Sequence, residues 1–172
     1  MKALYALAIA GLAAGACLVL IIILANRDAS QVQGTTGPGT LEPDRGAQRV
    51  TNAPATPASP VDEPPTSGPH RAEPVQADRN ELSDDQILEA LALGNVVIAY
   101  DGDPPAAVQE EVSGPFDPEL AAAGQAVILA KRPGLEGVQA LAWRRRLIAN
   151  GPDDPKLQEF AEAWLGQGAP DG

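Results

Sequence analysis

Cysteine and histidine are almost missing from this chain of 172 residues, which contains one of each. The only cysteine, Cys17, lies in an apolar run near the N-terminus. An intrachain disulfide, a cysteine-based zinc site and a cysteine nucleophile in a folded domain are therefore excluded. The sequence also has no glycine-rich phosphate loop, no nucleophile elbow and no paired histidine–carboxylate relay. The commonest catalytic and metal-binding motifs are thus absent.

Basic residues are scarce too, with 12 lysines and arginines against 23 acidic residues and a net charge of -11. The imbalance is greatest in residues 79–172, which hold seven basic and sixteen acidic residues. A domain of this charge repels phosphate backbones and anionic headgroups, so we expect no nucleic-acid binding and no membrane-surface role for the domain itself. Only 3% of the residues are aromatic, and the chain contains 17 prolines and 17 glycines. For a chain of this length and composition we expect no more than one modest folded domain.

One long apolar run is present, from Ala3 to Leu24 without a charge. Extended to Ala25 it has 23 residues, about 35 Å of helix, which is long enough to span a bilayer. We expect residues 1–27 to form a transmembrane anchor that contacts the membrane through residues 3–25. Lys2 in front of the run favours a cytoplasmic N-terminus, which makes the protein a single-pass protein of the cell membrane with an extracytoplasmic C-terminal domain.

Two kinds of cleavage are alternatives to this anchor. A secretory signal has an apolar run of roughly 7 to 15 residues, shorter than the run found here. The small residues before Cys17 resemble those before a bacterial lipoprotein cysteine, but further apolar residues follow Cys17 where such proteins become polar. The length of the run favours an uncleaved anchor.

A proline-rich segment follows the anchor. Residues 34–78 contain nine prolines among Thr, Ala, Ser, Gly and charged residues, with no apolar periodicity. Such a stretch buries too little surface to offset the entropy of ordering it. We therefore expect residues 28–62 to be a disordered tether, and the folded domain to occupy residues 63–172.

Capping signals mark the helices of this domain. Ser83 and Gln86 form a capping box in front of an apolar helical face that ends at Gly94. Pro104-Pro105 opens a short helix through Val112, and Asp117 caps another that Gly124 stops. Asp154 caps a closing helix that Gly166 ends; its apolar positions are Leu157, Phe160, Ala161, Trp164 and Leu165.

Short apolar runs between these helices predict strands. Val96–Tyr100 and Ala126–Ala130 read as buried strands, and Val138–Trp143 as a third that continues toward Ile148. A small sheet with helices packed on it, of the α/β or α+β class, accounts for this order of elements.

The string Pro64-Pro65-Thr66-Ser67-Gly68-Pro69-His70, followed by Leu91-Ala92-Leu93-Gly94-Asn95-Val96-Val97-Ile98, resembles an uncharacterised bacterial family, the domain of unknown function 3105. Its members are typically membrane-anchored, and the resemblance covers about Glu63 to Ala169, including Ala142-Trp143-Arg144. It implies the fold and topology of that family and supplies no established activity.

Members of the family usually read His-x-Leu-Glu-His-Gly before the valine strand, a pattern that looks like a metal or acid/base cluster. This chain departs from it at each position. Glu89 stands where the first histidine would be, Ala92 replaces the glutamate, and Leu93 replaces the second histidine. The resemblance therefore transfers no site.

Candidate ligand-binding residues remain. His70 could act as a ligand or proton shuttle with Asp101 or Asp103, but a lone histidine is better explained as a hydrogen-bonded residue that pins the family string to the domain. Arg144 and Arg145, with the arginine that follows them, could clamp a carboxylate or phosphate of a partner, or could simply balance nearby acids. The acidic residues lack the spacing of a calcium loop, and we expect neither catalytic nor metal-binding residues.

These observations favour a non-enzymatic binding or interaction module, displayed outside the membrane to meet a protein of the cell envelope, with no cofactor. A metal-handling or hydrolytic domain that uses His70 with carboxylates is the first alternative. A structural subunit of a membrane complex is the second. The sequence does not name the partner.

Overall fold

The computed structural model describes residues 37–52 and 54–170. One compact unit begins at Pro38. The predicted anchor over residues 3–25 lies outside the described residues, as does Cys17. Within the described ranges, no helix has both the length and the apolar character that a bilayer crossing requires.

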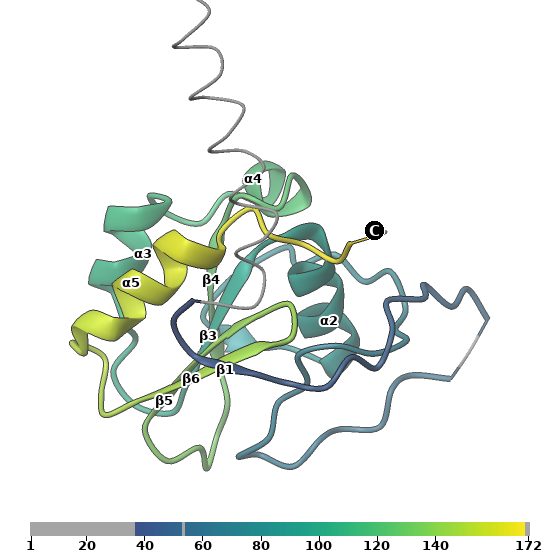
Figure 1. Cartoon of the computed structure of the whole chain (residues 1–172), viewed down its shortest axis with the longest axis horizontal. Coiled ribbons are helices and arrows are strands. Elements are labelled where there is room, and N and C mark those ends of the chain that lie inside the picture. Colours follow the sequence, from purple (N-terminus) through teal and green to yellow (C-terminus); the bar gives the residue numbers. More distant parts are fainter. Residues whose placement is uncertain (1–36, 53, 171–172) are drawn as a thin grey trace, which may run out of the picture. The chain divides into compact units, whose positions relative to one another are not determined.

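A mixed sheet of six strands forms the centre of the described unit, with the order β1-β6-β5-β3-β4-β2 (Figure 1). Strands β2, β3 and β4 run parallel, whereas β5 and β6 form an antiparallel hairpin beside β3, and β1 pairs antiparallel with β6. The strands are β1 (Thr40–Leu41), β2 (Asn80–Glu81), β3 (Val96–Tyr100), β4 (Val127–Lys131), β5 (Val138–Ala142) and β6 (Arg145–Ala149). Of the two predicted classes, α/β and α+β, the mixed sheet shows the α+β class.

Helices cover both faces of the sheet (Figure 1): α2 (Asp84–Leu93), α3 (Ala106–Val112), α4 (Pro118–Ala122) and α5 (Pro155–Trp164). Each prediction of a helix from its cap is confirmed. Ser83 and Gln86 close a complete capping box at the start of α2, and Asp117 and Asp154 accept backbone N–H groups at the starts of α4 and α5. These side chains satisfy donors that have no partner within the helix.

Two apolar cores result, one on each face. Alternation along β3 sends Val96 and Ile98 to the side of α3 and α5, where Phe160 and Trp164 pack. Val97 points to the side of α2, where it joins Leu91 and Trp143 among others. β3 and β4 are buried on both faces apart from Lys131, which explains why their sequences read as continuous apolar runs.

The prediction that one strand continues from Val138 toward Ile148 is wrong, because two strands occupy this stretch. The chain turns at Trp143 and Arg144 and returns as β6. Arg144 takes a left-handed conformation with φ of 57°, which is unusual for a residue other than glycine. No Gly or Asn-Gly signal marks this turn in the sequence, so the pattern alone could not locate it.

Residues 38–52 and 54–62, which we call the strap, also differ from the predicted disordered tether. The compact unit starts at Pro38 rather than at Glu63. The strap supplies β1, in the dark-blue segment of Figure 1, and its later residues pass the start of α2. Thr56 and Ser59 donate hydrogen bonds to Asp85 and Asp84 of α2. Hydrogen bonds to residues distant in sequence thus hold the strap in place, although the strap has no apolar periodicity of its own.

Candidate functional site

The β5–β6 end of the sheet is covered by a helix on one side alone. α5 contacts both strands there, whereas α2 on the opposite side contacts β3. The strand register puts the side chains of Gln139, Arg146 and Ile148 on the face of the sheet that α2 partly covers. Leu141 of the α2-side core points to the same face. Extended chain covers this side instead of a helix.

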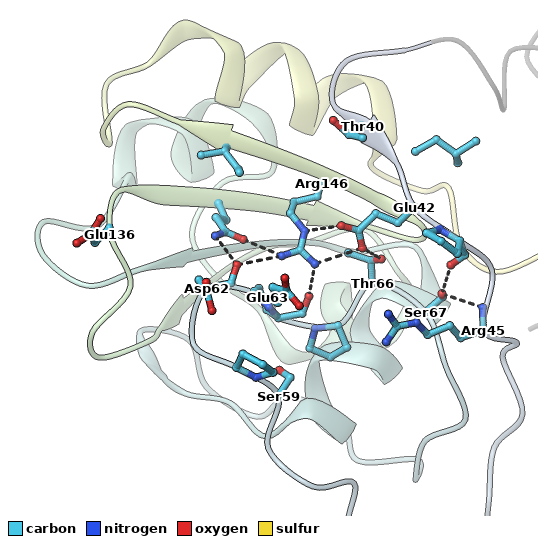
Figure 2. A pocket seen from close by; sticks show the side chains of 17 residues that line it. Thr40, Glu42, Arg45, Ser59, Asp62, Glu63, Thr66, Ser67, Glu136 and Arg146 are labelled. Carbon is cyan, nitrogen blue, oxygen red and sulfur yellow. Dashed lines mark hydrogen bonds and ion pairs between the residues drawn. The ribbon is translucent and has the colours of Figure 1, made fainter.

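An open cavity of about 740 Å³, which we call the hollow, lies here (Figure 2). Three parts of the chain line it. The first part of the strap and β1 form one wall, residues 59–67 form another, and side chains of β5 and β6 complete it together with Glu136. Residues 64–67 belong to the Pro-Pro-Thr-Ser-Gly-Pro-His string.

Arg146 lies at the centre of the hollow and joins its walls (Figure 2). Its Nε donates to Glu42 Oε1 at 2.6 Å and one terminal nitrogen donates to Glu42 Oε2 at 3.2 Å. The remaining bonds reach the carbonyl oxygens of Asp62 and Pro64 and the side-chain oxygen of Gln139, at 3.2, 2.7 and 3.3 Å. Five acceptors thus match the five N–H donors of a guanidinium, so Arg146 is a structural clamp.

Glu42 is the counter-ion of this clamp. Burial would raise the pKa of its carboxyl, but hydrogen bonds from Arg146 and Thr66 and the charge of Arg146 together hold that pKa below its usual value. Thr66 Oγ1 donates to Glu42 Oε2 at 2.5 Å. The strap is therefore tied to the family string through one ionised carboxylate.

The two arginines before Arg146 point elsewhere. Arg144 reaches the Glu42 carbonyl at 3.3 Å and Asp44 at 3.4 Å. Arg145 lies on the opposite side of the sheet, buried, with its guanidinium carbon 4.5 Å from the centre of the Trp164 ring. Burial first, and then the charge of Arg144, lowers the pKa of Arg145. The three arginines do not converge on one ligand, which the sequence alone could not show.

Three carboxylates at the rim of the hollow differ from the carboxylate of Glu42 in their exposure and in their contacts. The side chains of Asp62, Glu63 and Glu136 are exposed, and none of them forms a hydrogen bond or ion pair with another described residue. Figure 2 shows Asp62 and Glu63 below Arg146 and Glu136 at the far end of the hollow. The rim therefore carries three negative charges that no hydrogen bond or ion pair among the described residues neutralises.

Exposed apolar side chains gather at the same place. Among the described residues the large exposed hydrophobic side chains are Leu41, Val61 and Ile148, with exposed fractions of 43%, 41% and 70%. Ile148 lines the hollow with its side chain. Leu41 borders the hollow from β1, but its pairing with Arg145 turns its side chain to the opposite face of the sheet at the same edge. Val61 lines an adjoining depression of about 320 Å³ that shares Asp62 and Glu136 with it. The described surface thus collects its exposed large apolar groups in one region.

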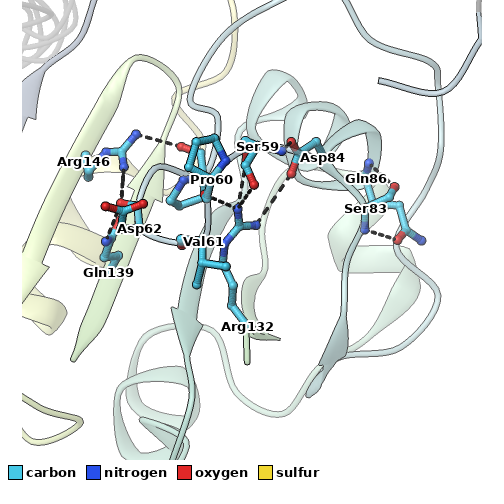
Figure 3. A network of polar contacts seen from close by, with 11 residues as sticks. Ser59, Pro60, Val61, Asp62, Ser83, Asp84, Gln86, Arg132, Gln139 and Arg146 are labelled. Carbon is cyan, nitrogen blue, oxygen red and sulfur yellow. Dashed lines mark hydrogen bonds and ion pairs between the residues drawn. The ribbon is translucent and has the colours of Figure 1, made fainter. Parts of the chain in front are cut away.

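A second polar cluster fixes the wall formed by residues 59–62 (Figure 3). Arg132, which follows β4, donates to carbonyl oxygens of Ser59, Pro60 and Val61. Asp84 at the start of α2 accepts from the Ser59 backbone N–H at 2.6 Å. These contacts make the hollow a fixed feature of the fold. Local sequence patterns do not predict these contacts, because the partners are 25 to 73 residues apart.

Comparison with known proteins identifies a family for this chain. Residues 55–171 match the family described as Protein of unknown function (DUF3105). The chain belongs to the DUF3105 family. No curated protein and no solved structure matches it. The resemblance inferred from the sequence is therefore confirmed.

The DUF3105 match begins at residue 55, earlier than the predicted domain boundary. It includes Thr56 and Ser59, which fasten the strap to α2, and the whole Pro-Pro-Thr-Ser-Gly-Pro-His string. It leaves out β1 and Glu42. One wall of the hollow is thus formed by residues of the DUF3105 match and the other by residues before it.

His70, the last residue of the string, lies completely buried, with an exposed fraction of 0%. Its Nδ1 is 2.8 Å from the Gly68 carbonyl and its Nε2 is 3.1 Å from Glu89 Oε2. Arg49 Nε donates to the same Glu89 oxygen at 3.0 Å. The resemblance to the family aligned Glu89 with the first histidine of the family pattern, and it did not predict that Glu89 contacts His70.

Asp101 and Asp103, the predicted partners of His70, lie in the turn after β3 and neither is bonded to it. Asp101 accepts the backbone N–H of Gly134 at 2.7 Å. Both residues line a small depression of about 240 Å³. Across residues 37–52 and 54–170, no group of three or more His, Cys, Asp or Glu side chains is placed to hold a metal ion.

Proposed function

We propose that this DUF3105 protein is a membrane-anchored, extracytoplasmic module that binds another protein of the cell envelope at the hollow. The observation that carries the proposal is the coincidence of Leu41, Val61 and Ile148 with the unpartnered carboxylates around one cavity. Exposed apolar groups rimmed by polar ones are typical of protein interaction sites. The polar networks around Arg146 and Arg132 hold the walls in place, which lowers the ordering cost of binding.

The membrane part of the proposal is supported by the sequence. The uncharged run of residues 3–25 is long enough to span a bilayer, and Lys2 precedes it. A hollow displayed outside the membrane would meet envelope proteins. Alkaline phosphatase fused after Gly172 is expected to be active in a bacterial host, and an inactive fusion at normal protein level would reverse the topology.

A photo-crosslinking amino acid placed at Ile148 of the full-length chain tests the docking surface. We expect one reproducible protein adduct in cells, and none from the same group at Glu110, an exposed residue of α3. The captured protein is then purified and its affinity for the full-length chain measured. An Ile148→Asp substitution is expected to weaken binding at least tenfold, and unchanged affinity would refute the site.

A further inference from the structure

We propose that the hollow receives an extended, basic segment of its partner, which pairs its backbone with Ile148 and sets lysine or arginine side chains against Asp62, Glu63 and Glu136. This inference rests on the proposed function and gives the chemistry of the partner. It is drawn from the free edge of β6, from the charge of the rim and from the apolar groups beside both.

The edge of β6 is only partly occupied. β1 pairs with Arg145 and Arg146, and the chain before it leaves the sheet, since the Pro38 carbonyl accepts the Trp164 Nε1–H at 2.9 Å. Strand β6 continues to Ala149. No described residue pairs with its outer edge beyond Arg146, so this part of β6 is an open sheet edge.

Alternation in the ladder shows which backbone groups are available there. The Glu42 backbone N–H donates to the Arg144 carbonyl at 2.8 Å, so Arg144 directs its backbone groups toward β1. In an antiparallel strand every second residue does the same, which applies to Arg146 and then to Ile148. Ile148 therefore offers one N–H donor and one C=O acceptor at the open edge, next to an exposed side chain that faces the hollow.

The charge of the rim selects the side chains of the bound segment. The hollow is lined by four acidic residues and by two arginines, Arg45 and Arg146. Asp62, Glu63 and Glu136 have no counter-ion among the described residues, whereas Arg146 has all its donors engaged, so the lining keeps a net negative charge. An acidic or phosphorylated segment would be repelled. A second copy of this chain, with its net charge of -11, is disfavoured for the same reason. A lysine- or arginine-containing segment complements the rim.

Alternation also sets the pattern of that segment. Side chains of an added strand point to opposite faces of the sheet at successive positions. Every second side chain would lie over the hollow beside the carboxylates. The others would point to the opposite face at the same edge, where Leu41 is exposed. An alternation of basic and apolar residues satisfies both faces.

The test uses the purified full-length chain and a fluorescent peptide of about eight residues that alternates lysine and valine. We expect saturable binding that weakens as salt rises, and no binding of the matched glutamate–valine peptide. Removing three charges with Asp62→Asn, Glu63→Gln and Glu136→Gln is expected to weaken binding about tenfold. These side chains have no bonding partner in the fold, so the variant is expected to stay folded, which its thermal midpoint checks.

Two controls make the result specific. Glu110→Gln, Glu111→Gln and Glu159→Gln remove the same charge from exposed positions of α3 and α5 and are expected to leave peptide binding unchanged. Ile148→Ala keeps the backbone N–H, whereas Ile148→Pro removes it without breaking a bond to β5, so proline is expected to weaken binding more than alanine.

Equal weakening by both sets of charge substitutions would overturn the inference, because it would show attraction to the whole acidic surface. Binding of the acidic peptide would overturn it too. If the crosslinked partner binds at Ile148 while the lysine–valine peptide does not, the inference fails and the proposed function stands. If no partner is found at Ile148, both fail.

Discussion

At the scale of single residues, the strap is held by carboxylates of α2 that are almost completely buried. Asp85, with an exposed side-chain fraction of 1%, accepts four hydrogen bonds. Two come from the backbone and hydroxyl of Thr56, and two from the backbone and Nε of Arg71. Burial would raise the pKa of Asp85, but these bonds together outweigh it and hold the pKa far below its usual range.

The depressed pKa of Asp85 makes part of the stability dependent on pH. Because the folded state favours the ionised carboxylate, its contribution is complete above the unfolded-state pKa of about 3.9 and is lost as pH falls toward the folded-state pKa. We expect Asp85→Asn to lower the free energy of unfolding by about 2–4 kcal/mol at pH 7. The difference from wild type should shrink below about pH 3.5. Urea titrations at several pH values measure it, with the exposed Asp153→Asn as control.

His70 is a second residue whose removal should disturb a buried bonding pattern. His70→Ala would leave the Gly68 carbonyl and one interaction of Glu89 unsatisfied and would open a cavity beside Trp143, whose ring centre is 6.5 Å from that of His70. We expect a loss of about 2–4 kcal/mol in the free energy of unfolding. Circular dichroism during urea unfolding measures it. A loss below about 0.5 kcal/mol would show that His70 does not pin the family string.

At the scale of elements, local signals predicted the helices and most of the strands. A capping box, Asp caps and apolar faces are short-range patterns, and α2, α4 and α5 begin where they place them. The β5–β6 turn was missed because Arg144 carries no local turn signal. The strap and the hollow were missed for a related reason. Glu42 and Arg146, which form the clamp, are 104 residues apart, and nothing near either residue identifies the other.

Helix α5 provides a test of packing at this scale. Trp164 is buried against the α3–α5 core, and its Nε1–H reaches the Pro38 carbonyl of the strap. Trp164→Ala is expected to cost about 3–5 kcal/mol through the cavity that it leaves. Trp164→Phe keeps a ring but removes the hydrogen bond, and should cost about 1 kcal/mol. A thermal midpoint within 2 °C of wild type for the alanine variant, on the order of less than 1 kcal/mol, would contradict this packing.

At the scale of the whole molecule, the strap sets the smallest stable unit. A fragment of residues 38–172 keeps every strap contact described above, and we expect it to unfold cooperatively. A fragment of residues 63–172 loses the strap partners of Asp84, Asp85, Arg132 and Arg146 and is expected to be unfolded or at least about 4 kcal/mol less stable. A fragment of residues 55–172, which matches the family range, should lie between them. Thermal unfolding of the three fragments checks this order, and equal midpoints would show that the strap contributes nothing.

The clamp between Glu42 and Arg146 has a consequence for the order of events during synthesis. The strap leaves the ribosome before the helices and the other strands, yet Arg146 follows Glu42 by 104 residues and Trp164 follows Pro38 by 126. At about 5 to 20 residues per second, roughly 5 to 25 s pass before these two partners have been synthesised. The part of the strap around β1 is therefore fixed late, and until then one wall of the hollow is missing. A nascent chain therefore presents no complete hollow to the proposed partner until its translation is nearly complete.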